Sequence, residues 1–513
     1  MISGVWIGHI PKHRGCESQL LTQSRIIPIF AALKTNEKYQ VVIGLEVHAQ
    51  LLTKSKLFSG DSIAFGAAPN TQVSPVSLAH PGTLPVMNKE VINLAIKLGL
   101  ALNCSITRHT YFARKNYFYP DLPKGYQVSQ DSEPICKGGF LDIETAPGVS
   151  RVLLNRIHME EDAGKSIHDL EDSYSCIDLN RAGTPLLEIV TEPCIHGSEE
   201  AFKFLTDLRK LLRWLNVCDG NMEEGSMRCD ANISIRPVGD TKLGTRVEVK
   251  NLNSIRNVKR AIEYEVERLI GLVENNETIL QQTRSFDASN GTTFALRSKE
   301  EADDYRYFPE PDLPAFHITD KHIQSIAASM PVMPAALQQD FKERYHLSEY
   351  DAAIICSDKE DAAFYEHLVT GNTHYKAAAN WMQGPLKAWC NEHNCSMGSF
   401  PLGPASVAAL IDFTEEGKVN FSVAASRILP VMVKEGGDPR AIAEKLNLLQ
   451  DSDETTVRVW ITQALVEMPD KVKEYKSGKK NLLGLFAGQV KKLSKGKADM
   501  ALVNKILAEE LNN

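Results

Sequence analysis

The segment VVIGLEVHAQL, residues 41–51, alternates apolar and polar side chains along most of its length. Successive side chains of a β-strand point to opposite faces, so one face would carry the apolar residues Val41, Ile43, Leu45, Val47 and Ala49. Glu46 and His48 would share the other face. The pattern therefore predicts a strand that packs its apolar face on a core and presents an acid and an imidazole on the opposite side.

Three further segments repeat this pattern. Their polar faces would carry Glu188 and Glu192 of TPLLEIVTEP (residues 184–193), Arg228 and Asp230 of SMRCDANISIR (226–236), and Arg246, Glu248 and Lys250 of TRVEVKNLNS (245–254). A single polar strand face is usually solvated. Several such strands paired in one sheet would instead form a pocket floor of mixed charge. That floor suits a divalent cation held by oxygen ligands and one imidazole, with Lys and Arg available for phosphate oxygens.

The β pattern extends from Lys38 to about Pro314, where short alternating segments, turns and glycines predict a mainly antiparallel β body. Two helices are expected within it, one at residues 198–216, opened by a Ser-Glu-Glu cap and first turn, and one at residues 253–275. Downstream the β pattern ends. Short helices are expected at residues 361–369, 375–391 and 404–417, with a hinge at KEGGDPR (434–440) before the final helices. The expected fold class is α+β.

The composition is that of a globular protein of more than one domain, with 513 residues, 43% hydrophobic residues and a net charge of -8. This negative net charge argues against a protein that coats nucleic acid over its whole surface, but it is compatible with a local basic patch.

The ten cysteines form no CxxC pair. A zinc site at CNEHNC (390–395) would need two more ligands, so free thiols in a reducing cytosol are favoured. No apolar run approaches the roughly 18 residues of a membrane span.

Residues 1–37 contain a short apolar piece, IIPIFAAL, between Arg25 and Lys34, with only two acids, Glu17 and Glu37. An organellar leader is one interpretation of this basic segment. It has neither a clear amphipathic pattern nor a small-residue cleavage site, so we expect a disordered N-terminal extension of a cytoplasmic protein.

The stretch HMEEDAGKS, residues 158–166, concentrates acids beside Lys165. Its end resembles a Walker A loop, but the first glycine of that motif would fall on Met159. The intervening acids would also repel a phosphate, so the phosphate-loop interpretation fails. A metal-binding strand end is favoured over an ordinary solvated one. His158 and His168 are expected to be structural or surface groups.

Nine lysines lie between Lys471 and Lys497, against Asp470 and Glu474. A lysine-rich helical face is usually just solvated. The alternative is contact with a nucleic-acid backbone, which needs clustered positive charge and no code for reading bases.

Seven motifs, in order along the chain, together resemble one family: VIGLEVHAQL, RKNYFYPDLPKGYQVSQ, HMEEDAGKS, DLNRAGTPLLEIVTEP, MEEGSMRCDANIS, KNLNS and DDYRYFPEPDLP. The family is the B subunit of the glutamyl/aspartyl-tRNA amidotransferases, and the resemblance runs from about Tyr39 to the C-terminus. It implies a cradle domain at residues 38–328, a helical domain at 329–440 and a C-terminal helical YqeY-like tail domain at 441–513.

The resemblance implies that ATP and Mg²⁺ activate the side-chain carboxyl of Glu-tRNA(Gln) or Asp-tRNA(Asn) to an acyl phosphate. Ammonia from an amidase A subunit would then displace the phosphate, with a small C subunit completing a heterotrimer. A closed pocket is expected, because open water would hydrolyse the intermediate. No amidase signature such as a Ser-Ser-Lys arrangement is visible here, so the ammonia must come from a partner.

The same resemblance assigns site residues. The implied metal ligands are His48, Glu46, Glu161, Glu188 and Asp230, with Glu160 as an alternative to Glu161. The implied catalytic residues are Glu46, Glu161, Asp230 and Lys115. The implied ATP-binding residues are Lys115, Arg114, Lys165 and Arg228. The implied tRNA contacts are Lys479, Lys480, Lys491, Lys492 and Lys495.

Two rival functions remain at this point. A free-standing ATP ligase or metal-dependent phosphohydrolase would turn over a small molecule without tRNA or a second subunit. A non-catalytic RNA-binding scaffold would tolerate alanine at Glu46, Glu161 and Asp230 but not in the lysine cluster.

Overall fold

The computed structural model describes residues 38–146, 148–168, 173–298, 305–371, 373–449, 454–494 and 497–512. The expected N-terminal extension at residues 1–37, whether disordered or a leader, lies outside the described residues. Contacts between Cα atoms divide the chain into two units, with the boundary between Pro331 and Val332.

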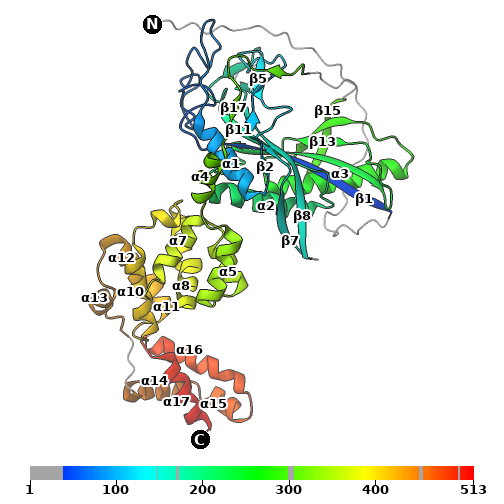
Figure 1. Ribbon diagram of the computed structural model, residues 1–513. Coiled ribbons are helices and arrows are strands. Elements are labelled where there is room, and N and C mark those ends of the chain that lie inside the picture. Colours follow the sequence, from blue (N-terminus) through cyan, green and yellow to red (C-terminus); the bar gives the residue numbers. More distant parts are fainter. Residues whose placement is uncertain are drawn as a thin grey trace. The chain divides into compact units, whose positions relative to one another are not determined.

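The first unit is organised around a ten-stranded sheet (Figure 1). Its order is β15 (Thr292–Ser298), β14 (Gln282–Asp287), β13 (Val247–Lys250), β12 (Met227–Pro237), β1 (Tyr39–Gln50), β11 (Pro185–Thr191), β8 (Gly148–Glu161), β6 (Cys136–Lys137) and β2 (Ser105–Ile106), and β7 (Phe140–Thr145) also pairs with β8. Each pair is antiparallel except β13 with β14, which is parallel. The mainly antiparallel sheet that the alternation predicted is confirmed.

The apolar faces of the central strands are buried as their alternation predicts. Ile43 and Val47 of β1 and Ala231 and Ile233 of β12 are each 0% exposed. Because side chains alternate along a strand, this burial leaves Glu46 and His48 on the opposite face of the sheet. The sheet therefore separates a hydrophobic core on one side from a polar surface on the other.

Among the described residues, four helices complete the first unit: α1 (Lys89–Ala101), α2 (Ser198–Trp214), α3 (Ile255–Glu274) and α4 (Asp320–Ala328). Ser254 caps α3 by accepting a 3.1 Å hydrogen bond from the Asn257 amide. The predicted serine cap of α2 is wrong: Gly197 is the N-cap, and Ser198 is already helical and donates to Glu263. The α2 and α3 helices pack on each other, and α3 packs on β12 and β15, so they cover the sheet (Figure 1).

Smaller sheets lie against this framework. They are formed by β16 (Phe308–Pro309), β4 (Ala113–Asn116) and β5 (Tyr126–Ser129), by β17 (Phe316–His317) and β3 (His109–Thr110), and by β9 (Lys165–Ile167) and β10 (Cys176–Asp178). The β5 strand contacts β8. This contact brings the three-stranded sheet, with Lys115 on β4, to the carboxyl end of β8.

The second unit is helical. Its first part contains α5 (Pro334–Tyr345), α6 (Glu349–Ile355), α7 (Lys359–Leu368), α8 (Tyr375–Trp381), α9 (Lys387–Glu392), α10 (Pro404–Glu415), α11 (Phe421–Val423), α12 (Leu429–Glu435) and α13 (Pro439–Lys445). The single helix expected at residues 375–391 is interrupted by a π-helical turn, Met382–Leu386, which contains Pro385. Proline lacks the amide proton of a regular helical turn, and a wider turn accommodates that loss.

The last helices share a hydrophobic core of their own. They are α14 (Glu454–Glu467), α15 (Pro469–Lys476), α16 (Leu483–Leu493) and α17 (Met500–Asn512), and the core includes Ile461, Phe486 and Ile506. The expected α+β class and helical C-terminal region are confirmed. The division at residue 440 falls inside α13, and the four-part domain layout stays a prediction.

Candidate functional site

A cavity of about 310 Å³ opens on the polar face of the sheet. Its lining combines acids, bases and amides from strands far apart in the sequence. The lining residues are Glu46, Lys115, Gln130, Asp131, Arg156, His158, Glu188, Asn232, Arg246, Glu248, Lys250, Tyr305 and Tyr307. All belong to the first unit.

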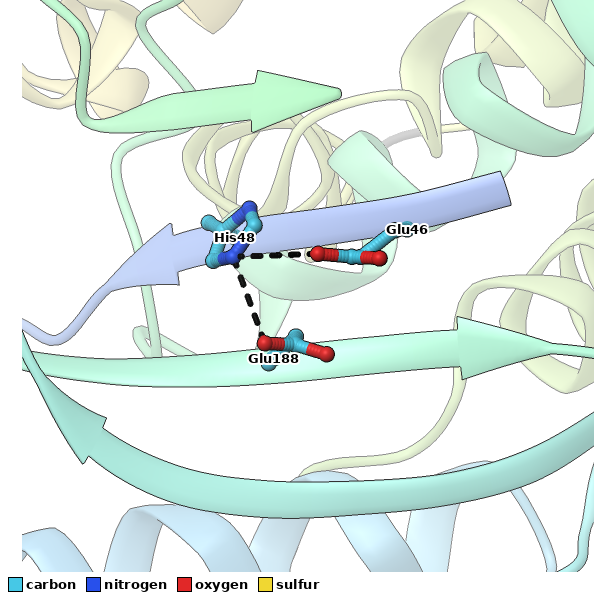
Figure 2. A group of neighbouring side chains, drawn as sticks. All are labelled: Glu46, His48 and Glu188. Atoms are coloured by element: carbon cyan, nitrogen blue, oxygen red, sulfur yellow. Dashed lines mark ion pairs between the residues drawn. The ribbon is translucent and has the colours of Figure 1, made fainter. Parts of the chain in front are cut away.

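Strand register brings the acids and imidazoles of this face together. His48 of β1 lies opposite Glu188 of β11, and Glu188 lies opposite His158 of β8. The His48 Nε2 atom lies 3.4 Å from a Glu188 oxygen and 3.7 Å from a Glu46 oxygen (Figure 2). It also lies 3.6 Å from a Glu160 oxygen. Three adjacent strands therefore hold one continuous acid–imidazole cluster.

The carboxylates of the cluster control the charge of its imidazoles. Burial lowers the pKa of His48, but its hydrogen bond with Glu188 and the charges of Glu160, Glu188 and Glu46 outweigh this and raise that pKa to about 9. Glu188 and Glu160 likewise raise the pKa of His158 to about 9 against the effect of burial. Burial and the charge of Glu188 raise the pKa of Glu46. The imidazolium groups thus neutralise carboxylates that would otherwise repel each other.

The donor geometry fits a divalent cation. Among the described residues, two groups of potential ligands have their donor atoms within 4.8 Å of one another, Glu46–His48–Glu188 and His158–Glu160–Glu188. Carboxylate oxygens suit Mg²⁺ and Mn²⁺, while the two imidazoles also suit transition metals such as Fe²⁺ or Zn²⁺. A bound cation would replace the protons of the imidazoles, because only the neutral ring is a ligand.

Glu161 does not join either group. The β8 strand continues to this residue, so its side chain points away from the face that carries His158 and Glu160. The Glu161 carboxylate lies 2.6 Å from Lys124 and accepts a 2.7 Å hydrogen bond from the Val128 amide. Glu160, the alternative to Glu161, belongs to the second group, and which of these two acids holds a metal stays a prediction.

Asp230 also lies beside the cluster and not within it. It faces Glu46 across the β1–β12 pair, but its Oδ2 atom accepts a 2.5 Å hydrogen bond from Lys250. Lys250 lies 3.1 Å from Glu248 as well. Burial would lower the pKa of Lys250, but these two acids raise it. Lys250 is therefore a fixed positive charge on the cavity wall.

Of the cations expected to bind ATP, only Lys115 lines the cavity. Arg114 makes two 2.8 Å hydrogen bonds to Glu310. Arg228 is 2.8 Å from Asp162, and Lys165 lies on β9 opposite Asp178. The sequence pattern placed Arg246 and Lys250 on a polar face whose Lys and Arg were available for phosphate oxygens, and both line the cavity. Sequence reasoning missed Arg156, although this residue shares the parity of His158 and Glu160, and it treated His158 as a structural or surface group although His158 lines the cavity.

Part of the lysine cluster is visible in the tail helices. Lys491 and Lys492 are exposed at the end of α16. Lys479 lies 3.1 Å from Glu474, and the Lys480 ammonium lies 4.2 Å from the Tyr475 ring. Lys495 lies outside the described residues.

The CNEHNC segment shows no metal-binding geometry. His393 stacks on Trp389 at 4.0 Å, and its Nδ1 lies 2.9 Å from the Trp389 carbonyl oxygen. Every cysteine in the described part of the chain is a free thiol, as expected. No described helix combines the length and apolar character that a membrane span requires.

Comparison with known proteins identifies one family over most of the chain. A family model described as the GatB/GatE catalytic domain matches residues 41–324, and one described as the GatB domain matches residues 363–511. A protein of Geotalea uraniireducens is 48% identical over 478 residues, which cover 93% of this chain and all of the relative. It is named as the B subunit of an aspartyl/glutamyl-tRNA(Asn/Gln) amidotransferase. A protein of the same name from Thermodesulfovibrio yellowstonii is 46% identical over 470 residues, covering 92% of this chain and 98% of the relative.

Proposed function

The chain belongs to the family of B subunits of the aspartyl/glutamyl-tRNA(Asn/Gln) amidotransferases, and from this premise we propose that it activates a tRNA-bound carboxylate. The substrate is Glu-tRNA(Gln), Asp-tRNA(Asn) or both. ATP phosphorylates the side-chain carboxyl, and ammonia then displaces phosphate to give the amide. The chain works in the cytoplasm as the B subunit of a heterotrimer with an amidase A subunit and a small C subunit.

One observation carries this proposal: an acid–imidazole cluster and a set of cations face the same cavity. A carboxylate is a poor electrophile until one of its oxygens becomes part of a phosphate leaving group. Phosphoryl transfer in turn requires positioning and charge neutralisation more than covalent help from the protein. The two kinds of charge on this cavity wall are the ones that such a transfer needs.

Different residues would hold the cation and contact the phosphates. Glu46, His48, His158, Glu160 and Glu188 would hold Mg²⁺, and the cation would supply charge neutralisation at the phosphates. Lys115 and Lys250 lie on the cavity wall where they can contact phosphate oxygens, and Glu160 raises the pKa of Lys115 against the effect of burial. The exposed Arg246 guanidinium is a third such cation. Asp230 and Glu248 hold Lys250 in place, and this positioning role replaces the ligand role predicted for Asp230.

The proposal is tested by ATP-dependent amide formation in the complex assembled from this chain and its A and C partners. The assay contains Glu-tRNA(Gln), ATP, glutamine and Mg²⁺, and compares wild type with Glu46→Ala and His48→Ala. The variants are expected to keep glutaminase activity and lose amidation. Normal amidation by both variants would favour the scaffold function, and turnover by this chain alone on a small molecule would favour the free-standing ligase.

Replacing Glu160 and Glu161 separately distinguishes the two neighbouring acids. Glu160→Gln is expected to weaken Mn²⁺ binding about tenfold or more, because the amide lacks the negative charge of the carboxylate. Glu161→Gln is the matched control and is expected to change Mn²⁺ affinity less than twofold, since its carboxylate pairs with Lys124. Calorimetric titration of the assembled complex measures both. Equal weakening by the two substitutions would contradict this arrangement.

The exposed lysines of the tail are proposed to contact the tRNA backbone. Replacing both Lys491 and Lys492 with alanine is expected to reduce the slope of log affinity against log salt by about 1 for each phosphate that the protein no longer neutralises. Filter binding of the assembled complex to tRNA at several salt concentrations measures this slope. Lys38→Ala removes an exposed lysine of the first unit and is expected to leave the slope unchanged. An unchanged slope in the double variant would show that these lysines contact no tRNA phosphate and are only solvated.

A further inference from the structure

Two tyrosines form a wall of the cavity that the proposed phosphoryl transfer does not use. Tyr305 and Tyr307 both line the cavity, and Tyr307 remains 39% exposed. Their ring centroids lie 6.1 Å apart at 73°, and Tyr305 meets Tyr117 at 6.1 Å and 69°. These are edge-to-face contacts, which hold the rings in place without stacking one face on another.

The backbone of this wall is held in a strained conformation. Arg306, between the two tyrosines, has a φ of 46°, which a side chain of this size rarely adopts. The conformation is fixed from both sides. The Asn116 side chain donates a 2.8 Å hydrogen bond to the Arg306 carbonyl, and the Asn116 amide donates one of 3.0 Å to the Tyr305 carbonyl. Immediately afterwards, Phe308 of β16 pairs with Arg114 of β4. Strain that the surrounding structure maintains in this way is typical of binding sites.

This wall lies next to Lys115, the cation proposed above to contact phosphate oxygens. The Lys115 ammonium lies 4.9 Å from the centre of the Tyr305 ring and 5.8 Å from that of Tyr117. A nucleotide has the matching layout, because a flat base and an anionic phosphate are joined through one ribose. Aromatic side chains beside a positively charged groove are how proteins hold unpaired bases.

We infer that Tyr305 and Tyr307 form a stacking subsite for an adenine base, with Tyr307 supplying the accessible ring. Two substrates of the proposed reaction carry adenine: ATP, and the 3′-terminal adenosine of the tRNA to which the amino acid is attached. The inference rests on the proposed function and names the part of its substrate that this wall holds. A rival role is simple packing at the edge of the unit, in which the rings contact no ligand.

The test uses the assembled complex and measures kcat and KM separately for ATP and for Glu-tRNA(Gln). The variants are Tyr307→Ala, which removes the ring, and Tyr307→Phe, which keeps it. Phe118→Ala is the matched control, because Phe118 is a 91% exposed aromatic that does not line the cavity. Thermal unfolding of each variant identifies any general loss of structure, and Tyr307→Leu retains much of the side-chain volume if the alanine variant is unstable.

Loss of a stacked base is expected to raise one KM by roughly five- to a hundredfold in Tyr307→Ala, with Tyr307→Phe and Phe118→Ala within about twofold of wild type. A raised KM for ATP assigns the subsite to its adenine, and a raised KM for tRNA assigns it to the terminal adenosine. Unchanged KM values for both substrates would overturn the inference, as would an equal effect of Tyr307→Phe. The wild-type complex reports separately on the proposed function, which fails if that complex forms no amide with ATP.

Discussion

Glu188→Gln is expected to lower ATP-dependent amidation by the assembled complex roughly 10²- to 10³-fold. Glu188 belongs to both groups of potential ligands and lies 3.4 Å from His48 and 3.4 Å from His158. These imidazoles also lower the pKa of Glu188 well below its usual value against the effect of burial, so this carboxylate is charged at neutral pH. Replacing it with an amide removes the shared negative charge while keeping nearly the same shape.

The measurement is the rate of Gln-tRNA(Gln) formation with glutamine and ATP, alongside glutaminase activity without tRNA. Glu192→Gln is a matched control, because Glu192 follows the same strand with the same parity but hydrogen-bonds Asn155 and does not line the cavity. It is expected to leave amidation within a few-fold of wild type. A similar loss in both variants would show that the effect arises from the strand and not from the cluster.

Glu265→Ala is expected to destabilise the first unit by about 3–5 kcal/mol, because it leaves buried arginine charge without its partner. The Glu265 side chain on α3 is 0% exposed. It lies 2.7 Å from Arg268 of the same helix and 3.0 Å from Arg284 of β14, and it also accepts a hydrogen bond from Thr293 of β15. The Glu265 carboxylate thus links α3 to strands β14 and β15 at the edge of the sheet.

Urea unfolding of the full chain measures this effect as a lowered midpoint. Glu274→Ala, near the end of the same helix, is the control, since Glu274 pairs with Lys38 at the surface. Exposed pairs of this kind contribute little to stability, so the midpoint is expected to change far less than in Glu265→Ala. If both substitutions lowered the midpoint equally, the buried network would have no special role in stability.

Strand parity was enough to predict the polar face of the sheet. The alternation around Glu46 and His48 identified β1, and the same rule placed Glu188 and Lys250 on polar faces before any resemblance was considered. Parity also separated Glu160 from Glu161. It could not show that β8 remains a strand up to Glu161, so the choice of Glu161 as a ligand rested on the resemblance alone. The structure places the Glu161 side chain on the side of β8 opposite His158 and Glu160.

Long-range pairing limits what else the sequence could predict. Nothing near Arg114 indicates that Glu310, almost 200 residues later, pairs with it and withdraws it from the cavity. The same limit applies to Asp162, which pairs with Arg228. Tyr307, which lines the cavity, directly precedes β16, and β16 pairs with the distant strand β4. Contacts between segments so distant depend on the assembled fold and leave no periodic signal in either segment.

The central claim is that this cavity activates a carboxylate, and trapping the activated group tests it most directly. The assembled complex is incubated with Glu-tRNA(Gln), ATP, Mg²⁺ and hydroxylamine in place of glutamine, and the γ-hydroxamate of glutamate is quantified. Wild type is expected to form this product only when ATP is present, and Glu188→Gln is expected to form almost none. Equal yields of the γ-hydroxamate from wild type and Glu188→Gln would contradict the account.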